Sequence, residues 1–112
     1  MDLARAFVDL GHLRIAVVAL DRLEHDCDTA NAGLPELKSF VLPGGTEAAA
    51  RLHMARATCR RAEREVLACA READVNPLAA VYLNRLSDLL FILARAANSG
   101  GAEPLWTPGG ER

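Results

Sequence analysis

Four polar residues recur in steps of three and four along the middle of the chain: His53, Arg56, Arg60 and Glu63. If this stretch is helical, their side chains form one line beside the apolar face. Guanidinium groups match phosphate oxygens in a fork of two hydrogen bonds, and a carboxylate can hold such a fork in place. The line therefore suits a local site for a polyphosphate.

A second polar line follows further along the chain, where Asn84, Asp88 and Arg95 are spaced four and seven residues apart. Two helices packed antiparallel would bring the two lines together and place arginines, two carboxylates and an amide at one partly buried site. The alternative is that these residues form ordinary ion pairs on helix surfaces, as most charges at such spacings do. Spacing alone favours the ion-pair interpretation.

Apolar periodicity and turn residues divide the chain into three helices that must position these side chains. The first is expected over about residues 3–29, where Gly11 can kink or divide it, with apolar residues at helical spacing: Leu3, Phe7, Leu10, Leu13, Val17, Leu20 and Leu23. The second is expected from its N-cap, Thr46, with an apolar stripe of Leu52, Ala55, Cys59, Ala62, Val66, Cys69 and Ala73.

The third helix has the clearest start, with Asn76 as N-cap and Pro77 at the first helical position. Its apolar stripe is Leu78, Tyr82, Leu86, Leu89, Leu93 and Ala96, and the residues from Asn98 to Gly101 end it. Residues 102–112 are rich in proline and glycine and are expected to form an extended tail, ordered only if Trp106 docks on the rest. The prediction is one all-α domain over residues 1–112, a helical bundle of three main helices.

Composition narrows the class of protein. The chain has 112 residues with a formal net charge of −2, which provides no overall basic field for nucleic acid or an anionic membrane. Neither a signal peptide nor a transmembrane span fits the sequence. The three cysteines form no CxxC pair, so we expect reduced thiols, at core-facing or half-buried positions, in a cytoplasmic protein. No catalytic triad or metal site can be assembled, because no motif surrounds any of the three histidines, His12, His25 and His53.

Two stretches resemble the ATP:corrinoid adenosyltransferases of the propanediol-utilization type nearly letter for letter. They are Phe40 to Arg64, which reads FVLPGGTEAAARLHMARATCRRAER, and Tyr82 to Arg95, which reads YLNRLSDLLFILAR. The resemblance implies a truncated form of a five-helix up-and-down bundle that assembles as a homo-oligomer, most simply a trimer. Its implied activity is transfer of the 5′-deoxyadenosyl group of ATP, supplied with Mg²⁺, to the cobalt of cob(I)alamin or a related corrinoid.

The resemblance also implies roles for individual residues. Those matching the family's ATP-binding positions are Arg60, Arg61, Ala62, Glu63, Arg64 and Asn84. Those matching positions that support the site are Arg56, which pairs with an aspartate of a neighbouring subunit, and Asp88 and Arg95, which organise the third helix. Phe40 matches the aromatic residue that fills the lower face of the corrin and displaces its axial base.

The sequence departs from the family at its start. The family's Thr-x-x-Gly-Asp-x-Gly loop, whose backbone N–H groups wrap the triphosphate, has no counterpart here, so we expect one wall of an ATP site. We therefore expect the isolated chain to turn over slowly and an extension that carries the loop to restore activity. The alternatives are a corrinoid- or nucleotide-binding protein that needs a partner chain for the loop, and a plain helical interaction module.

Overall fold

The computed structural model describes the backbone of residues 3–37, 39–101 and 103–107, and the side chains of these residues from Val17 onward. It contains three helices: α1 (Leu3–Asn31), α2 (Glu47–Cys69) and α3 (Leu78–Ala97). The one backbone bridge outside helices among the described residues joins Val41 and Leu105 in antiparallel fashion. The predicted all-α class with three main helices is confirmed.

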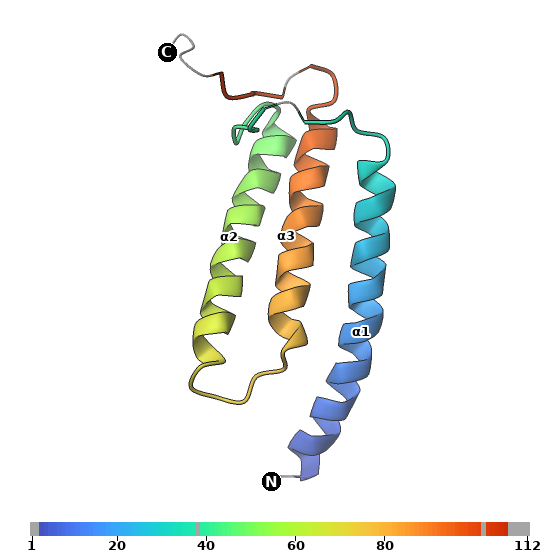
Figure 1. The fold of residues 1–112 in the computed structure, drawn as a ribbon, viewed down its shortest axis with the longest axis vertical. Coiled ribbons are helices and arrows are strands. Elements are labelled where there is room, and N and C mark those ends of the chain that lie inside the picture. Colours follow the sequence, from blue (N-terminus) through green and yellow to red (C-terminus); the bar gives the residue numbers. More distant parts are fainter. Residues whose placement is uncertain (1–2, 38, 102, 108–112) are drawn as a thin grey trace.

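Helix α3 lies between the other two helices (Figure 1). Both α1 and α2 pack against α3, and within the described residues α1 and α2 do not pack against each other. Helix α2 runs antiparallel to α3, whereas α1 and α3 run in the same direction. Each side of α3 therefore meets a different neighbour, and this divides the polar residues of α3 between two interfaces.

The helix starts follow the capping residues that the sequence predicts. The Thr46 hydroxyl accepts a hydrogen bond from the Ala49 N–H at 3.2 Å and satisfies a donor of the first turn of α2. At α3 the Asn76 side chain accepts from the Leu78 N–H at 2.9 Å. Helix α3 begins at Leu78, one residue later than predicted, so Pro77 and not Asn76 stands at its N-cap position, although Pro77 already has helical dihedral angles.

Other boundaries differ from the predictions. Helix α1 extends to Asn31 and continues through Gly11 without a break. Helix α2 ends at Cys69, about one turn before Ala73, where the Glu72 N–H bonds to the Cys69 carbonyl in a tight turn. The chain must reverse there to reach α3, and the proline after Asn76 disfavours helix at that residue.

Burial follows the three-helix arrangement more closely than it follows the predicted stripes. The buried apolar residues are Leu23, Ala49, Cys59 and Ala94, and the buried polar residues are His53, Ser87, Arg95 and Asn98. Leu93, predicted to face the core, is 38% exposed, because the buried arc of α3 includes the next two residues instead. Val17, Ala55, Cys69 and Ala73 are also exposed, contrary to prediction. The predicted stripe residues Leu3, Phe7, Leu10 and Leu13 lie outside the described side chains.

Removing the cap of α2 should destabilise the fold. We expect Thr46→Ala to lower the free energy of unfolding by about 1 kcal/mol, because the Ala49 N–H loses its acceptor. The measurement is urea unfolding followed by circular dichroism. Thr58→Ala is the control, since the Thr58 hydroxyl bonds only to the Met54 carbonyl within the same helix and alanine favours helix. Equal losses in the two variants would contradict the capping role.

Candidate functional site

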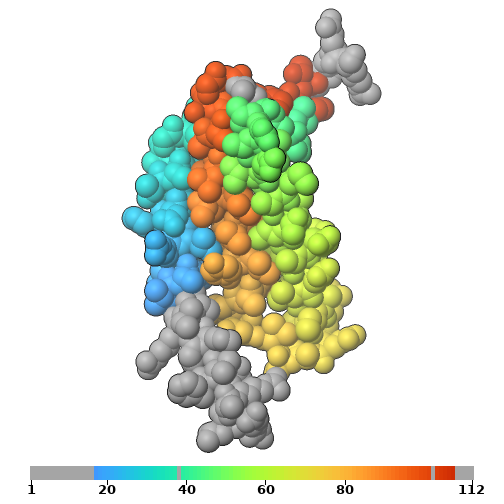
Figure 2. Space-filling view, turned by 180° about the vertical axis from the view of Figure 1, so that it is seen from behind, coloured from blue at the N-terminus to red at the C-terminus, as the bar shows by residue number. Residues whose placement is uncertain are grey.

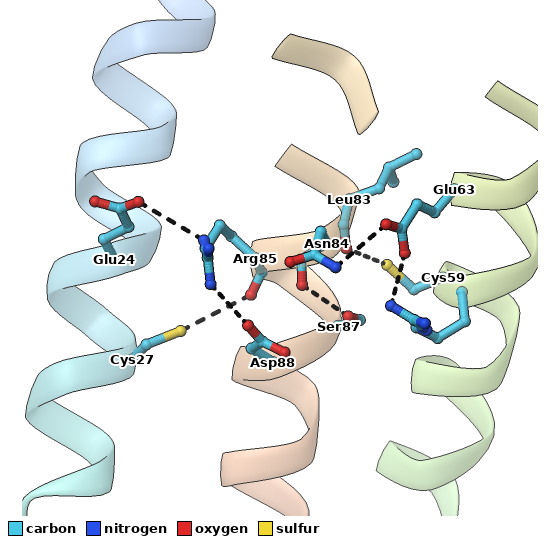
Figure 3. A network of polar contacts seen from close by, with 10 residues as sticks. Glu24, Cys27, Cys59, Glu63, Leu83, Asn84, Arg85, Ser87 and Asp88 are labelled. Carbon is cyan, nitrogen blue, oxygen red and sulfur yellow. Dashed lines mark hydrogen bonds and ion pairs between the residues drawn. The ribbon is translucent and has the colours of Figure 1, made fainter. Parts of the chain in front are cut away.

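The clearest polar cluster joins α2 to α3 through the carboxylate of Glu63 (Figure 3). One oxygen of Glu63 accepts from Arg60 Nη1 at 2.9 Å, and the other accepts from Asn84 Nδ2 at 3.2 Å. The side chain of Glu63 is 13% exposed and that of Arg60 is 43% exposed. The carboxylate thus holds a half-exposed guanidinium at a defined place beside the helix interface.

A buried thiol lies next to this cluster. Cys59 donates a hydrogen bond to the Leu83 carbonyl at 3.1 Å, and Leu83 is the residue before Asn84 in the chain. Burial raises the pKa of the Cys59 thiol, and the nearby Glu63 carboxylate raises this pKa further. Cys59 therefore remains a protonated donor that fixes α2 against α3, and its burial agrees with the sequence prediction.

The aromatic ring of Phe91 continues the α2–α3 interface toward the start of α2. The guanidinium carbon of Arg56 lies 5.1 Å from the ring centroid, and the His53 ring meets Phe91 edge-on with centroids 6.2 Å apart. A cation over an aromatic face is attracted by the ring quadrupole. None of the ion pairs among the described residues includes Arg56.

His53 is buried rather than part of an open polar line. It is 8% exposed, and its Nε2 has no hydrogen-bond partner among the described residues. Burial lowers the pKa of His53, the positive charge of Arg56 lowers it further, and Glu103 acts in the opposite direction. At neutral pH the ring is therefore neutral.

A separate polar group lies between α1 and α3 (Figure 3). Arg85 pairs with Asp88 at 3.0 Å and lies 3.7 Å from Glu24 of α1, and the Cys27 thiol donates to the Arg85 carbonyl. Burial and then the charge of Asp88 raise the pKa of Cys27. These residues line a pocket of about 430 Å³ that also includes Phe91 and Arg95.

The third group lies where α2 begins and α3 ends, and Figure 2 shows these two segments side by side. Arg95 is 6% exposed and donates to Glu103 at 3.0 Å and to the Pro35 carbonyl at 2.9 Å. It therefore fastens both the connection after α1 and the segment after α3 to the end of the bundle. A charge so buried needs such partners.

Phe40 lies on an exposed edge of this end of the bundle. Its side chain is 75% exposed and meets the ring of Trp106 edge-on, with centroids 6.0 Å apart. The Trp106 N–H donates to the Phe40 carbonyl and the Leu42 N–H to the Pro104 carbonyl, each at 2.8 Å. Residues 103–107 thus pair with the segment that bears Phe40, whereas Ala102 and residues 108–112 lie outside the described residues.

The structure brings together only part of the single site that the two polar lines suggested. Arg60, Glu63 and Asn84 meet, but Asp88 pairs with Arg85 toward α1, and Arg95 lies at the end of the bundle. A step of four residues turns a helix by about 40°, and α3 has a different neighbour on each side. Asp88 therefore does not join Glu63 at one site, and its contact with Arg85 is the kind of ion pair that spacing alone favours.

The remaining predicted residues lie on the outer part of α2 or within its packing. Arg61 and Arg64 are exposed, and Ala62 is half-buried. Sequence reasoning gave no role to Phe91, Arg85 or Glu103, and it gave Asn98 only a role in ending the third helix. Phe91 lies within the stretch YLNRLSDLLFILAR, yet its ring contacts depend on α2 residues that are distant in the chain.

Residues 2–97 match the family model of cobalamin adenosyltransferase. The corrinoid adenosyltransferase of Mycobacterium tuberculosis (strain H37Rv) is 60% identical over 102 residues, which are 89% of this chain and 52% of that protein. Corrinoid adenosyltransferase PduO of Citrobacter freundii is 51% identical over 66% of this chain and 22% of its own length. The chain thus spans about half the length of the mycobacterial relative.

Solved structures show the same similarity in three dimensions. A phenylalanine-to-alanine variant of the PduO-type ATP:corrinoid adenosyltransferase from Lactobacillus reuteri, complexed with cobalamin and ATP, matches with a TM-score of 0.72 and 38% identity. The match covers 80% of this chain and 50% of that one. An arginine-to-lysine variant of the same enzyme, complexed with ATP, matches with a TM-score of 0.73, over 80% of this chain and 52% of that one.

His53 should make the stability of the fold sensitive to mild acid. Its pKa in the folded state lies below the ordinary 6.5, so the unfolded state binds the proton more readily. The contribution of neutral His53 to the free energy of unfolding is complete above about pH 6.5, and it is lost as the pH falls through the lowered pKa of the folded state. We expect His53→Gln to reduce the difference in the free energy of unfolding between pH 7.5 and pH 5.5.

The measurement is urea unfolding at the two pH values, with His25→Gln as the matched control because His25 is exposed. An unchanged pH dependence in His53→Gln, equal to that of the control, would show that His53 does not carry the effect.

Proposed function

We propose, on the premise that this chain belongs to the cobalamin adenosyltransferase family, that it serves to transfer the 5′-deoxyadenosyl group of ATP to the cobalt of cob(I)alamin or a related corrinoid. Co(I) supplies an electron pair to C5′, the C5′–O bond breaks, and triphosphate leaves with the electrons of that bond. Triphosphate carries several negative charges, so positioned cations favour its departure.

The observation that carries the proposal is the contact of Glu63 with both Arg60 and Asn84. Glu63 uses Arg60 Nη1, and other N–H groups of this half-exposed guanidinium can donate to phosphate oxygens. A guanidinium already held by a carboxylate loses little conformational freedom on binding. Asn84 supplies an amide at the same place for the rest of the nucleotide.

The neighbouring basic residues extend this ATP-binding stretch in our proposal. Arg61 and Arg64 are exposed, so their guanidinium groups are accessible to a ligand or to another copy of the chain. Ala62 is half-buried between them and allows the nucleotide to approach the helix backbone. Mg²⁺ is proposed to accompany ATP, because Mg²⁺ at nucleotide sites is held largely by substrate phosphates and water.

Phe40 is proposed as the residue beneath the corrin. Its exposed ring, beside Trp106, offers an apolar surface on which a corrin can lie. An apolar lower face favours loss of the axial base and four-coordinate cobalt, from which the nucleophilic Co(I) state forms.

Assembly of several copies, most simply a trimer, is also part of the proposal. Exposed apolar side chains occur on all three helices, among them Val18, Leu67 and Val81, and contact with another copy of the chain would remove such side chains from water. Arg56, oriented by Phe91, is available to an aspartate of a neighbouring subunit. Asp88 and Arg95, whose partners lie within the chain, are proposed to support the site through α3.

A cytoplasmic location is also part of the proposal, and it rests on the free cysteines, which suit a reducing compartment. Separately, none of the described helices is long and apolar enough to cross a bilayer.

Loss of the arginine pair should remove binding of the triphosphate. ATP should raise the melting temperature of the chain, and Arg60→Ala combined with Arg61→Ala should abolish the rise, since each charge-assisted bond contributes roughly 1.5–3 kcal/mol. The measurement is thermal unfolding with ATP and with AMP. Arg51→Ala is the control, because Arg51 lies on the same helix but pairs only with Glu47. Equal shifts in all three proteins would show that the arginines are surface charges.

Turnover tests the reaction itself. The conversion of cob(I)alamin to alkylcobalamin is followed by visible absorbance, for the chain alone and for the chain extended by a segment that carries the family's glycine-rich loop. We expect slow turnover of the chain alone, faster turnover of the extended form, and a loss of rate on Phe40→Ala. If neither form binds ATP or cobalamin, only a helical interaction module remains.

A further inference from the structure

Asn98 is among the most buried polar side chains of the described residues, at 1% exposed, and it lies at the C-terminal cap of α3. Its Oδ1 accepts from the Thr46 N–H at 2.9 Å, and its Nδ2 donates to the Gly44 carbonyl at 2.8 Å. One carboxamide thus holds two backbone groups of the turn before α2. A carboxylate could not donate to the Gly44 carbonyl, and an aliphatic side chain could make neither bond.

Glycine at position 45 leaves the space that this carboxamide occupies. A Cβ atom at Gly45 would lie 2.4 Å from both Oδ1 and Nδ2 of Asn98, and Gly45 has a φ of +99°, which favours glycine. The Thr46 hydroxyl also donates to the Ala97 carbonyl at 3.3 Å. The end of α3 and the start of α2 are therefore joined by three hydrogen bonds at one point.

The position of Phe40 depends on its backbone, because a ring that is 75% exposed has little packing to hold it. Toward the C-terminus, the chain from Phe40 passes through the pairing of Leu42 with Pro104 and then enters the turn held by Asn98. Gly44 also approaches Pro104, since a Cβ atom at Gly44 would lie 3.7 Å from that ring. The turn and the paired segment thus form one unit anchored on Asn98.

We propose that Asn98 is a positioning residue of the corrinoid site, which holds the turn of Gly44 to Thr46 and through it sets the place of Phe40. This inference rests on the proposed function for its consequence in binding, but the positioning itself is a property of the free chain. Asn98 acts through the backbone and does not contact the ligand.

The first test needs no ligand. Asn98→Ala is compared with Asn76→Ala, which removes the carboxamide that caps the opposite end of α3 and does not contact the turn. Amide hydrogen exchange is measured by NMR for Leu42, Thr46 and Trp106. We expect exchange at all three to accelerate by about tenfold or more in Asn98→Ala, from loss of buried hydrogen bonds, and to stay near wild type in Asn76→Ala. Unchanged protection at Leu42 and Trp106 in folded Asn98→Ala would overturn the proposal.

Asn98→Asp keeps the acceptor for the Thr46 N–H and loses the donor to the Gly44 carbonyl. We expect this variant to retain protection at Thr46 and to lose it at Leu42, which a general loss of stability would not do. Equal loss of protection at both amides would contradict the separate roles of Oδ1 and Nδ2 of Asn98.

The second test measures cobalamin affinity for wild type, Phe40→Ala, Asn98→Ala and the double variant. If Asn98 acts through Phe40, both single variants weaken binding and the double variant is no weaker than Phe40→Ala. Additive losses would show that Asn98 acts independently of Phe40. Failure of the wild-type chain to bind cobalamin would instead contradict the proposed function, while the exchange experiment would still decide the positioning role.

Discussion

The carboxylate of Glu63 determines much of the geometry of the candidate ATP site. It accepts one hydrogen bond from its own helix, through Arg60, and one from α3, through Asn84. Because the Glu63 carboxylate is largely buried, the loss of either hydrogen bond to it would be costly. The relative position of α2 and α3 is therefore limited to one in which both bonds can form. The Cys59 thiol, bonded to the carbonyl of Leu83, fixes the same pair of turns from the adjoining position. Catalysis by positioned charge requires this kind of rigidity, since a loosely held guanidinium would adjust to the substrate as well as to the transition state.

Much of the fold follows from local features of the sequence. The three helices and the capping roles of Thr46 and Asn76 depend on periodicity and on side chains within a few residues, so they could be predicted. The pairing of Arg60 with Glu63 is likewise a matter of spacing along one helix.

Features that depend on neighbours distant in the chain could not be predicted in the same way. Periodicity identifies one apolar face, but α3 has two partners, so Leu93 is exposed and Arg95 is buried. The spacing predicts His53 in a polar line beside the apolar face of α2, whereas its burial against Phe91 depends on the register between the helices. The roles of Asn98 and Glu103 arise because the chain returns to the end of α3 from both directions, which no local pattern records.

Within the described part of the chain α3 separates α1 from α2, and this arrangement has a consequence for the order in which the fold forms. Helices α2 and α3 are joined by a short connection, so their pairing closes a small loop at low entropic cost. The contacts at the far end of the bundle span much longer stretches, such as Arg95 to Pro35 and Asn98 to Gly44, and closing them is slower. The helical hairpin of α2 and α3 is therefore expected to form first, and α1 and the Phe40 segment are expected to pack onto it afterwards.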